Sequence, residues 1–129
     1  MKQYDEWNEV KKQVDERKIS INFKEREIYW VSIGENIGFE QNGKGQEFAR
    51  PIIIIKKLNK QLFFGVPLST TIRDGSYFYN FEFLKNLKSS ALLVQAKVFD
   101  IKRANQKLGM INKKDFTELK KKLGELLDL

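Results

Sequence analysis

The side chains that could do chemistry in this chain are arginine, lysine, carboxylate, tyrosine and hydroxyl groups, because the sequence contains no histidine and no cysteine. That composition excludes a histidine general base, a cysteine nucleophile and a Ser-His-Asp triad. It also excludes disulfides and zinc sites built on these residues. An enzyme with this composition must use the remaining groups, or a hard cation held by oxygens.

Arg50 is the most informative of the remaining groups, since it stands directly before Pro51 and the aliphatic run Ile52 to Ile55. The residue before a proline is restricted to extended conformations. A guanidinium makes planar, bidentate bonds to phosphate and keeps its charge at any relevant pH. By position alone, however, a surface arginine paired with a carboxylate is the simpler interpretation.

Hydroxyl groups cluster after Pro67, at Ser69, Thr70 and Thr71. They could bond phosphate or ribose, although capping of a turn is a common role for such residues. Farther on, Gln95 and Lys97 fall on one face of an expected strand. Such a polar face is usually solvated, but in a basic protein it is also suited to contact nucleic acid.

The segment from residue 38 to 45 combines glycines with Lys44 and could cradle a phosphate with backbone N–H groups, although a mobile turn is the simpler interpretation. It lacks the spacing of a phosphate-binding P-loop. The carboxylates are scattered without a recurrent ligand spacing, so we expect no metal and no cofactor.

The length of 129 residues indicates one domain with at most a short extension. A net charge of +7 favours a polyanionic partner such as nucleic acid, although a lysine-rich surface without a partner has the same charge. The first residues lack the apolar stretch of a signal peptide, and no apolar run is long enough to span a bilayer. We therefore expect a cytoplasmic protein with no membrane partner.

The elements that must position these residues are expected to be mainly strands. Apolar spacing predicts a helix over 2–18, with Tyr4, Trp7, Val10 and Val14 on one side, and an amphipathic helix after Asn112 that carries Phe116, Leu119, Leu123, Leu126 and Leu127. Five strands are expected, over 28–33, 52–55 opened by Pro51, 62–66, 77–83 and 91–99. Hairpin-length links between them favour a small, strongly curved β-barrel or paired sheets.

Five short segments, in this order, resemble motifs of the MazF/PemK family of toxins. They are Arg26–Val31, Gly38–Gln41, Arg50–Ile55, Pro67–Thr70 and Leu92–Arg103. The resemblance implies an SH3-like β-barrel over residues 26–129, preceded by an N-terminal helical extension over 1–25. It also implies a metal-independent endoribonuclease that is specific for single-stranded RNA, is normally a homodimer and is paired with an acidic antitoxin.

Carried over from that family, Arg50 is the catalytic arginine, and Ser69 stands where the family usually has a threonine. Thr70 is the alternative hydroxyl. The resemblance assigns RNA contacts to Glu40, Gln41, Gln95 and Lys97, and we add Lys44 from the glycine-rich segment. Lys97 replaces an arginine, which turns a bidentate contact into a point charge.

Two other functions remain compatible with the sequence. One is a non-catalytic toxin on the same barrel, similar to CcdB, that binds a protein such as gyrase. The other is a plain RNA-binding barrel.

Overall fold

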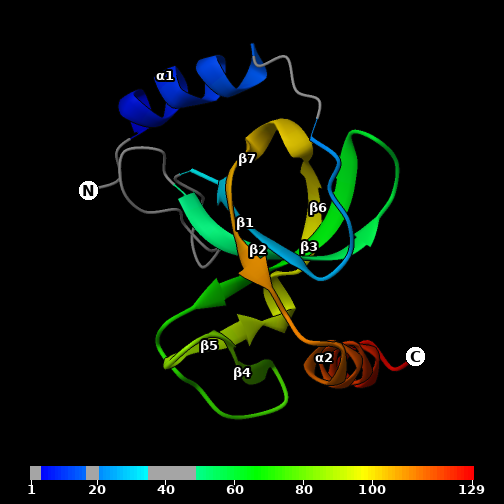
Figure 1. The fold of residues 1–129 in the computed structure, drawn as a ribbon. Helices are drawn as coiled ribbons and strands as arrows, with labels where there is room; N and C mark the ends of the chain where they lie inside the picture. The colour runs from blue at the N-terminus through cyan, green and yellow to red at the C-terminus, as the bar shows by residue number, and fades with distance from the viewer. Residues whose placement is uncertain (1–3, 17–20, 35–48) are drawn as a thin grey trace.

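The computed structural model describes residues 4–16, 21–34 and 49–129 (Figure 1). In chain order the elements are α1 (Tyr4–Asp15), β1 (Glu27–Ser32), β2 (Ala49–Lys57), β3 (Leu62–Ser69), β4 (Phe78–Leu84), β5 (Leu87–Leu92), η1 (Leu93–Gln95), β6 (Lys97–Asp100), η2 (Ile101–Arg103), β7 (Ala104–Met110) and α2 (Lys113–Leu126). No helix in these ranges is long and apolar enough to cross a membrane.

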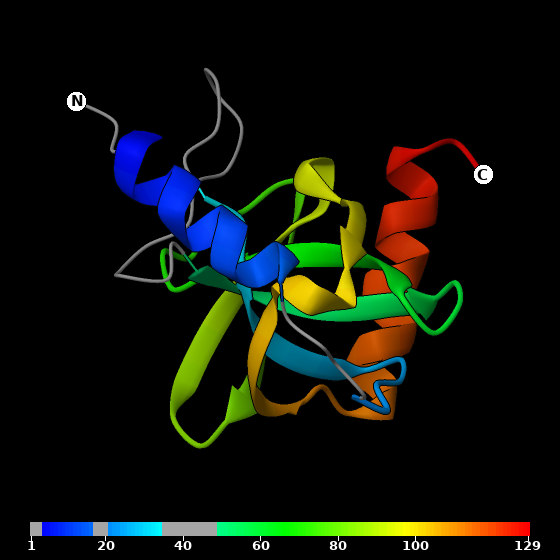
Figure 2. The same ribbon diagram turned by 90° about the horizontal axis from the view of Figure 1, so that it is seen from above.

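The seven strands form one antiparallel sheet in the order β4-β5-β3-β2-β1-β7, with β6 paired to β3. The sheet curls around a common centre, and α1 and α2 lie on opposite sides of it (Figures 1 and 2). The expected mainly β, SH3-like barrel with an N-terminal and a C-terminal helix is therefore confirmed.

The β2 strand is buried on both faces, as its unbroken aliphatic run predicts. Ile53 and Ile55 belong to the α2 core, which is the apolar cluster covered by α2. Ile52 and Ile54 belong to the barrel core, the second cluster, which lies inside the curl of the sheet. Alternation along one strand thus joins the two cores of the protein.

The single strand expected over 91–99 is wrong, because the chain there forms β5, η1 and β6 in succession. Both β5 and β6 pair with the same edge of β3, at Leu68↔Ala91 and at Gly65↔Lys97. Leu68 and Gly65 are three residues apart on β3, whereas their partners Ala91 and Lys97 are six residues apart. The surplus of three residues equals the length of η1, which absorbs it.

The expected starts and ends of two strands also need correction. Pro51 is the third residue of β2 rather than its first, and β3 continues through Pro67 to Ser69. At Pro51 the strand is paired with β1, whereas its ladder with β3 begins only at Ile52. An open edge is where a strand tolerates proline. The β7 strand was not predicted, since its polar residues do not alternate with apolar ones.

The α1 helix is confirmed, and it is attached to the barrel by Trp7, which is 7% exposed, and by Val14. Tyr4, expected on the same apolar side, is instead exposed. The indole of Trp7 packs on Gly34, where an added Cβ would lie 2.0 Å from Trp7 Cε2. Gly34 also has a φ of +78°, so glycine is required there for two reasons.

The α2 helix begins as predicted, with Asn112 Oδ1 accepting from the N–H of Asp115 at 2.7 Å. Its buried side chains are Phe116, Leu119 and Leu123. Leu127, expected beside them, lies past the end of the helix and is exposed.

A polar network holds β1 to β7 around the buried carboxylate of Glu27. Lys107 Nζ lies 2.6 Å from Glu27 Oε2, while the Lys24 N–H and the Tyr29 hydroxyl donate to Oε1 at 2.8 and 3.2 Å. Burial by itself raises the pKa of Glu27, but Lys107 and the other donors outweigh it and hold this pKa below its usual value. Burial and the charge of Glu27 raise the pKa of Tyr29 to about 12.

We expect Gly65→Ala to destabilise the protein by about 1–3 kcal/mol, because it overpacks the contact between β2 and β3. An added Cβ would lie 2.6 Å from Ile52 Cγ2 and 2.9 Å from Phe63 Cε2. Urea unfolding measures the change. Gly124→Ala in α2 is the control, since its Cβ meets nothing within 4 Å and the substitution favours the helix. Equal stabilities for the two variants would contradict this packing.

We expect the stability of the folded protein to fall as pH rises from 10 to 12, in part through Tyr29. In that window the tyrosine ionises in the unfolded chain while it stays protonated in the folded one, so the unfolded state binds fewer protons. Tyr29→Phe should flatten the stability profile there, and Tyr77→Phe, at an exposed position, should not. Identical profiles for wild type and Tyr29→Phe would contradict the prediction.

Candidate active site

Arg50 reaches the end of β3, next to Ser69. The ladder between β2 and β3 pairs Ile52 with Pro67 and Ile53 with Val66, and Arg50 and Ser69 are the residues two positions beyond its end on the two strands. On its other edge Arg50 pairs with Val31 of β1. The arginine therefore lies between two strands, near the start of β2.

The guanidinium of Arg50 is enclosed by the protein and is oriented by the backbone of β3. Its Nη1 donates to the carbonyl oxygen of Leu68 at 3.3 Å, and the residue is only 7% exposed. Burial lowers the pKa of Arg50 from its usual value. An arginine starts from so high a value that it remains charged at neutral pH. A fixed cation in such surroundings interacts with an anion more strongly than one in water.

The hydroxyl of Ser69 lies at the end of β3 and caps the turn that follows. Its Oγ accepts from the N–H of Thr71 at 3.1 Å, which confirms the capping role expected for this cluster. A serine hydroxyl that accepts one bond can still donate its own proton. Thr70 lies beyond the strand and is exposed. Ser69 is therefore the hydroxyl that directly follows the residue to which Arg50 is bonded.

Lys97 and Gln95 lie on the other edge of β3. Lys97 is the first residue of β6, pairs with Gly65 and is exposed, and its Nζ lies 5.3 Å from the centre of the Phe99 ring. Gln95 closes η1 and is half-buried. The two residues do not share one strand face as expected, because η1 interrupts the strand.

Three expected RNA contacts, Glu40, Gln41 and Lys44, lie outside the described residues. Within the described ranges no group of three acidic side chains could hold a metal ion.

Basic residues that the sequence analysis did not single out lie beside this site. Lys11 of α1 and Arg103 of η2 line a pocket with Lys97, between the helix and β6. Arg103 Nη1 donates to the carbonyl oxygen of Ser32 at 3.2 Å. Lys11 follows Trp7 by one helical turn and therefore shares its face, a spacing that could have identified it. Nothing in the sequence brings Arg103 to α1.

The chain is similar to solved toxin structures over most of its length. It matches MazF from Deinococcus radiodurans with a TM-score of 0.71 and 17% identity, over 85% of this chain and 100% of the other. It matches the toxin MazF-mt6 of Mycobacterium tuberculosis with a TM-score of 0.62 and 16% identity, over 81% and 98%. It matches a mycobacterial endoribonuclease, solved in complex with its cognate antitoxin, with a TM-score of 0.63 and 14% identity, over 83% of this chain and 96% of the other.

These likenesses, at low identity, concern the fold. No curated protein matches the chain by sequence. The family assignment comes from a sequence profile described as "PemK-like, MazF-like toxin of type II toxin-antitoxin system", which matches residues 24–127. This match covers most of the chain and leaves α1 outside it. The chain therefore belongs to the PemK-like, MazF-like toxins of type II toxin–antitoxin systems.

Proposed function

We propose that this toxin is a metal-independent, sequence-selective endoribonuclease that cleaves single-stranded RNA such as mRNA. The observation that carries the proposal is the position of the Arg50 guanidinium on the carbonyl oxygen of Leu68, the residue directly before Ser69. Membership of the toxin family and the likeness to structures of endoribonucleases support it.

The proposed chemistry needs no nucleophile from the protein. The ribose 2′-oxygen attacks the adjacent phosphorus and loses its proton, and the bond from phosphorus to the 5′-oxygen breaks as that oxygen gains a proton. The products are a 2′,3′-cyclic phosphate and a 5′-hydroxyl. DNA, which lacks the 2′-hydroxyl, is not cut. A chain without histidine or cysteine can support this reaction because the substrate supplies the attacking group.

Arg50 and Ser69 act on the phosphate that reacts. Arg50 stabilises the negative charge that develops on the non-bridging oxygens, and it is a poor general base because its high pKa keeps it protonated at neutral pH. Ser69 donates its hydroxyl proton to the same phosphate. Gln95 and Lys97 hold the flanking RNA, together with Glu40, Gln41 and Lys44, for which the family resemblance and the sequence are the support.

Of the aromatic residues near these strands, Trp30 is the one we assign to base stacking. It is 36% exposed, whereas Tyr29 is buried in the barrel core with its hydroxyl on Glu27. An exposed indole face is what a splayed-out base requires.

The partners in this proposal follow from charge and family. The net charge of +7 attracts RNA and also an acidic antitoxin protein. One similar structure was solved as an endoribonuclease with its cognate antitoxin, which supports the second partner. We propose a homodimer in the cytoplasm, by analogy with the family.

Arg50→Ala should reduce cleavage by roughly 10²–10³-fold, because it removes the positive charge at the reacting phosphate. Long single-stranded RNA is incubated with the protein in excess EDTA, and the fragment ends are tested for cyclic phosphate. Arg50→Lys keeps the positive charge but loses the planar guanidinium that can make two bonds to phosphate. Its cleavage rate should therefore lie between those of Arg50→Ala and the wild type.

Three outcomes of that assay would contradict the proposal. Cleavage that requires Mg²⁺ would overturn the metal-independent chemistry. RNA that is bound but left intact would favour a plain RNA-binding barrel, and gyrase inhibition with intact RNA would favour a CcdB-like toxin. Circular dichroism of the Arg50 variants shows whether a loss of activity reflects a loss of fold.

Ser69→Ala should slow cleavage more than Thr70→Ala does, since Ser69 directly follows the residue whose carbonyl oxygen accepts from Arg50. Ser69→Thr should keep the wild-type rate of cleavage, because it retains a hydroxyl and introduces the residue usual in the family. Single-turnover rates on one RNA compare the variants. A larger loss for Thr70→Ala would assign the hydroxyl to Thr70 instead.

A further inference from the structure

We propose that α1, which lies outside the family match, supplies part of a phosphate-binding subsite for single-stranded RNA. The subsite consists of Lys11 from α1, Lys97 from β6 and Arg103 from η2. This inference rests on the proposed function and adds to it a second contact with the RNA backbone, away from the reacting phosphate.

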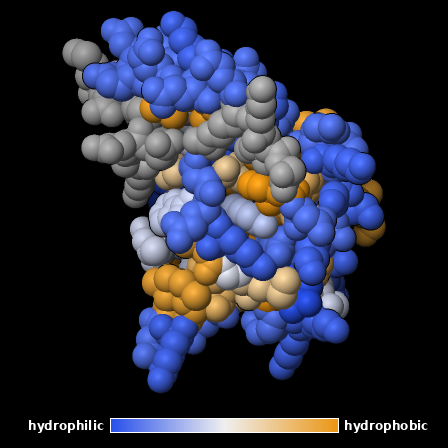
Figure 3. All heavy atoms as spheres, turned by 45° about the horizontal axis from the view of Figure 1, so that its top comes forward, coloured by the Kyte–Doolittle hydropathy of each residue, from blue (hydrophilic) through white to orange (hydrophobic). Residues whose placement is uncertain are grey.

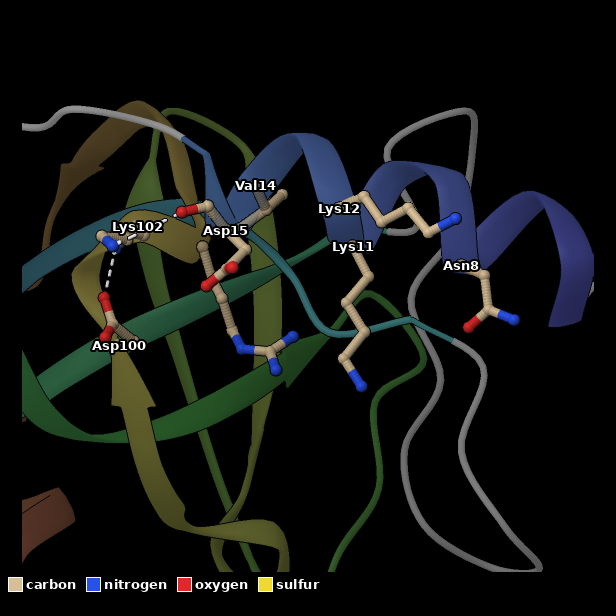
Figure 4. Close-up of a pocket in the computed structure, with 8 residues that line it drawn as sticks. Asn8, Lys11, Lys12, Val14, Asp15, Asp100 and Lys102 are labelled. Atoms are coloured by element: carbon tan, nitrogen blue, oxygen red, sulfur yellow. Dashed lines mark hydrogen bonds between the residues drawn. The ribbon is translucent and has the colours of Figure 1, made fainter.

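The helix holds Lys11 in a defined place because α1 is anchored to the barrel one turn away. Trp7 is buried against Gly34, which follows β1, and the guanidinium carbon of Arg103 lies 5.8 Å from the centre of the indole. Val14 is buried at the other end of the helix. Figure 4 shows Lys11 extending from α1 towards the strands, while Lys12 lies along the helix. The outer face of α1 is hydrophilic, so the apolar contacts are on the barrel side (Figure 3).

The pocket between α1 and β6 has a volume of about 180 Å³, and the described residues that line it include three cations and no carboxylate. Trp7, Ile33 and Phe99 form the apolar walls. Among the described residues, neither Lys11 nor Lys97 has a carboxylate partner. Three positive charges from separate elements, with no acid among the described lining residues, are suited to hold an anion.

An adjoining, larger cavity of about 530 Å³ shares Lys11 and Arg103 but differs in charge (Figure 4). Asp15 and Asp100 also line it. Lys102 is already held there, since its N–H donates to Asp100 Oδ1 at 2.8 Å and its Nζ to the carbonyl oxygen of Asp15 at 3.4 Å. Because two carboxylates line this larger cavity, the smaller pocket is the better anion site.

The pocket lies on the same side of the sheet as the candidate active site. Ile33 follows Val31, the partner of Arg50 in β1, by two residues and so shares its face. Lys97 pairs with Gly65, four residues before Ser69, which is roughly 13 Å along β3. The separation of the two sites along β3 is within reach of one strand of RNA.

The chemistry of the pocket favours the RNA backbone over a base. The indole of Trp7 is 7% exposed and has Arg103 over its ring, so it offers no free face for stacking. What remains are point charges around a small space, which recognise a phosphodiester without reading sequence. The subsite thus adds affinity for any single strand and leaves base selection to other residues.

The test is the salt dependence of binding to a fluorescein-labelled, mixed-sequence single-stranded RNA that is methylated at every 2′-hydroxyl and so cannot be cleaved. Each phosphate neutralised on a single strand contributes about 0.7 to the slope of log K against log salt. Lys11→Ala should lower the slope by about 0.7. Lys11→Arg should keep it. Lys12→Ala is the matched control, because it removes the same charge next to Lys11 from a side chain that faces Glu9 at 3.5 Å.

A wild-type slope in Lys11→Ala, or an equal drop in Lys12→Ala, would overturn the subsite. Absence of binding by the wild-type protein would also overturn it. Cleavage of unmodified RNA is measured separately. A protein that cuts RNA but shows no Lys11 effect loses the subsite and keeps the proposed function, whereas a Lys11-dependent slope without cleavage supports the subsite and contradicts the nuclease.

Discussion

The antiparallel pairing of β2 with β3 is the constraint on which the rest of the structure depends. Its register divides the isoleucines of β2 between the α2 core and the barrel core, so one strand joins both apolar clusters. Beyond the end of this ladder, Arg50 donates to the carbonyl oxygen of Leu68, the residue directly before Ser69. A shift by one residue would turn every side chain of β2 to the opposite face, which would exchange its isoleucines between the two cores and turn Arg50 away from the end of β3. Stability and the candidate site are therefore determined by a single alignment.

The other edge of β3 explains how polar residues gather at this site. Because β5 and β6 share that edge, the chain must make the short turn η1 between them. The turn places Lys97 at the start of a new strand, beside Gly65, instead of in the middle of a long one. Gly65 itself has no room for a side chain, because an added Cβ would meet Ile52 and Phe63, and the Lys97 ammonium lies over the ring of Phe99.

The N-terminal helix shows how an added segment can become part of an existing site. Its attachment depends on the contact of Trp7 with Gly34, which follows β1. No residue with a side chain fits at position 34, because its Cβ would clash with the indole and the φ there is positive. Arg103 connects both parts, since it lies over the indole and donates to the carbonyl oxygen of Ser32. The helix thereby brings a lysine to a face of the barrel that is already basic. From its residue types alone, α1 would be assigned only a packing role. The same packing of Trp7 on the barrel fixes the position of Lys11.

Local patterns in the sequence determined much of this protein. The features that these patterns predicted are both helices with the Asn112 cap, four of the seven described strands, the burial of β2 on both faces and the absence of histidine or cysteine chemistry. The resemblance to the toxin family, carried by short motifs, identified Arg50 and Ser69. Only the tertiary structure decided the division of the expected strand over 91–99, the existence of the polar strand β7 and the meeting of Lys11 with Arg103. Those features arise from pairing between strands and packing between elements far apart in the chain, and neither leaves a periodic signal in the local sequence.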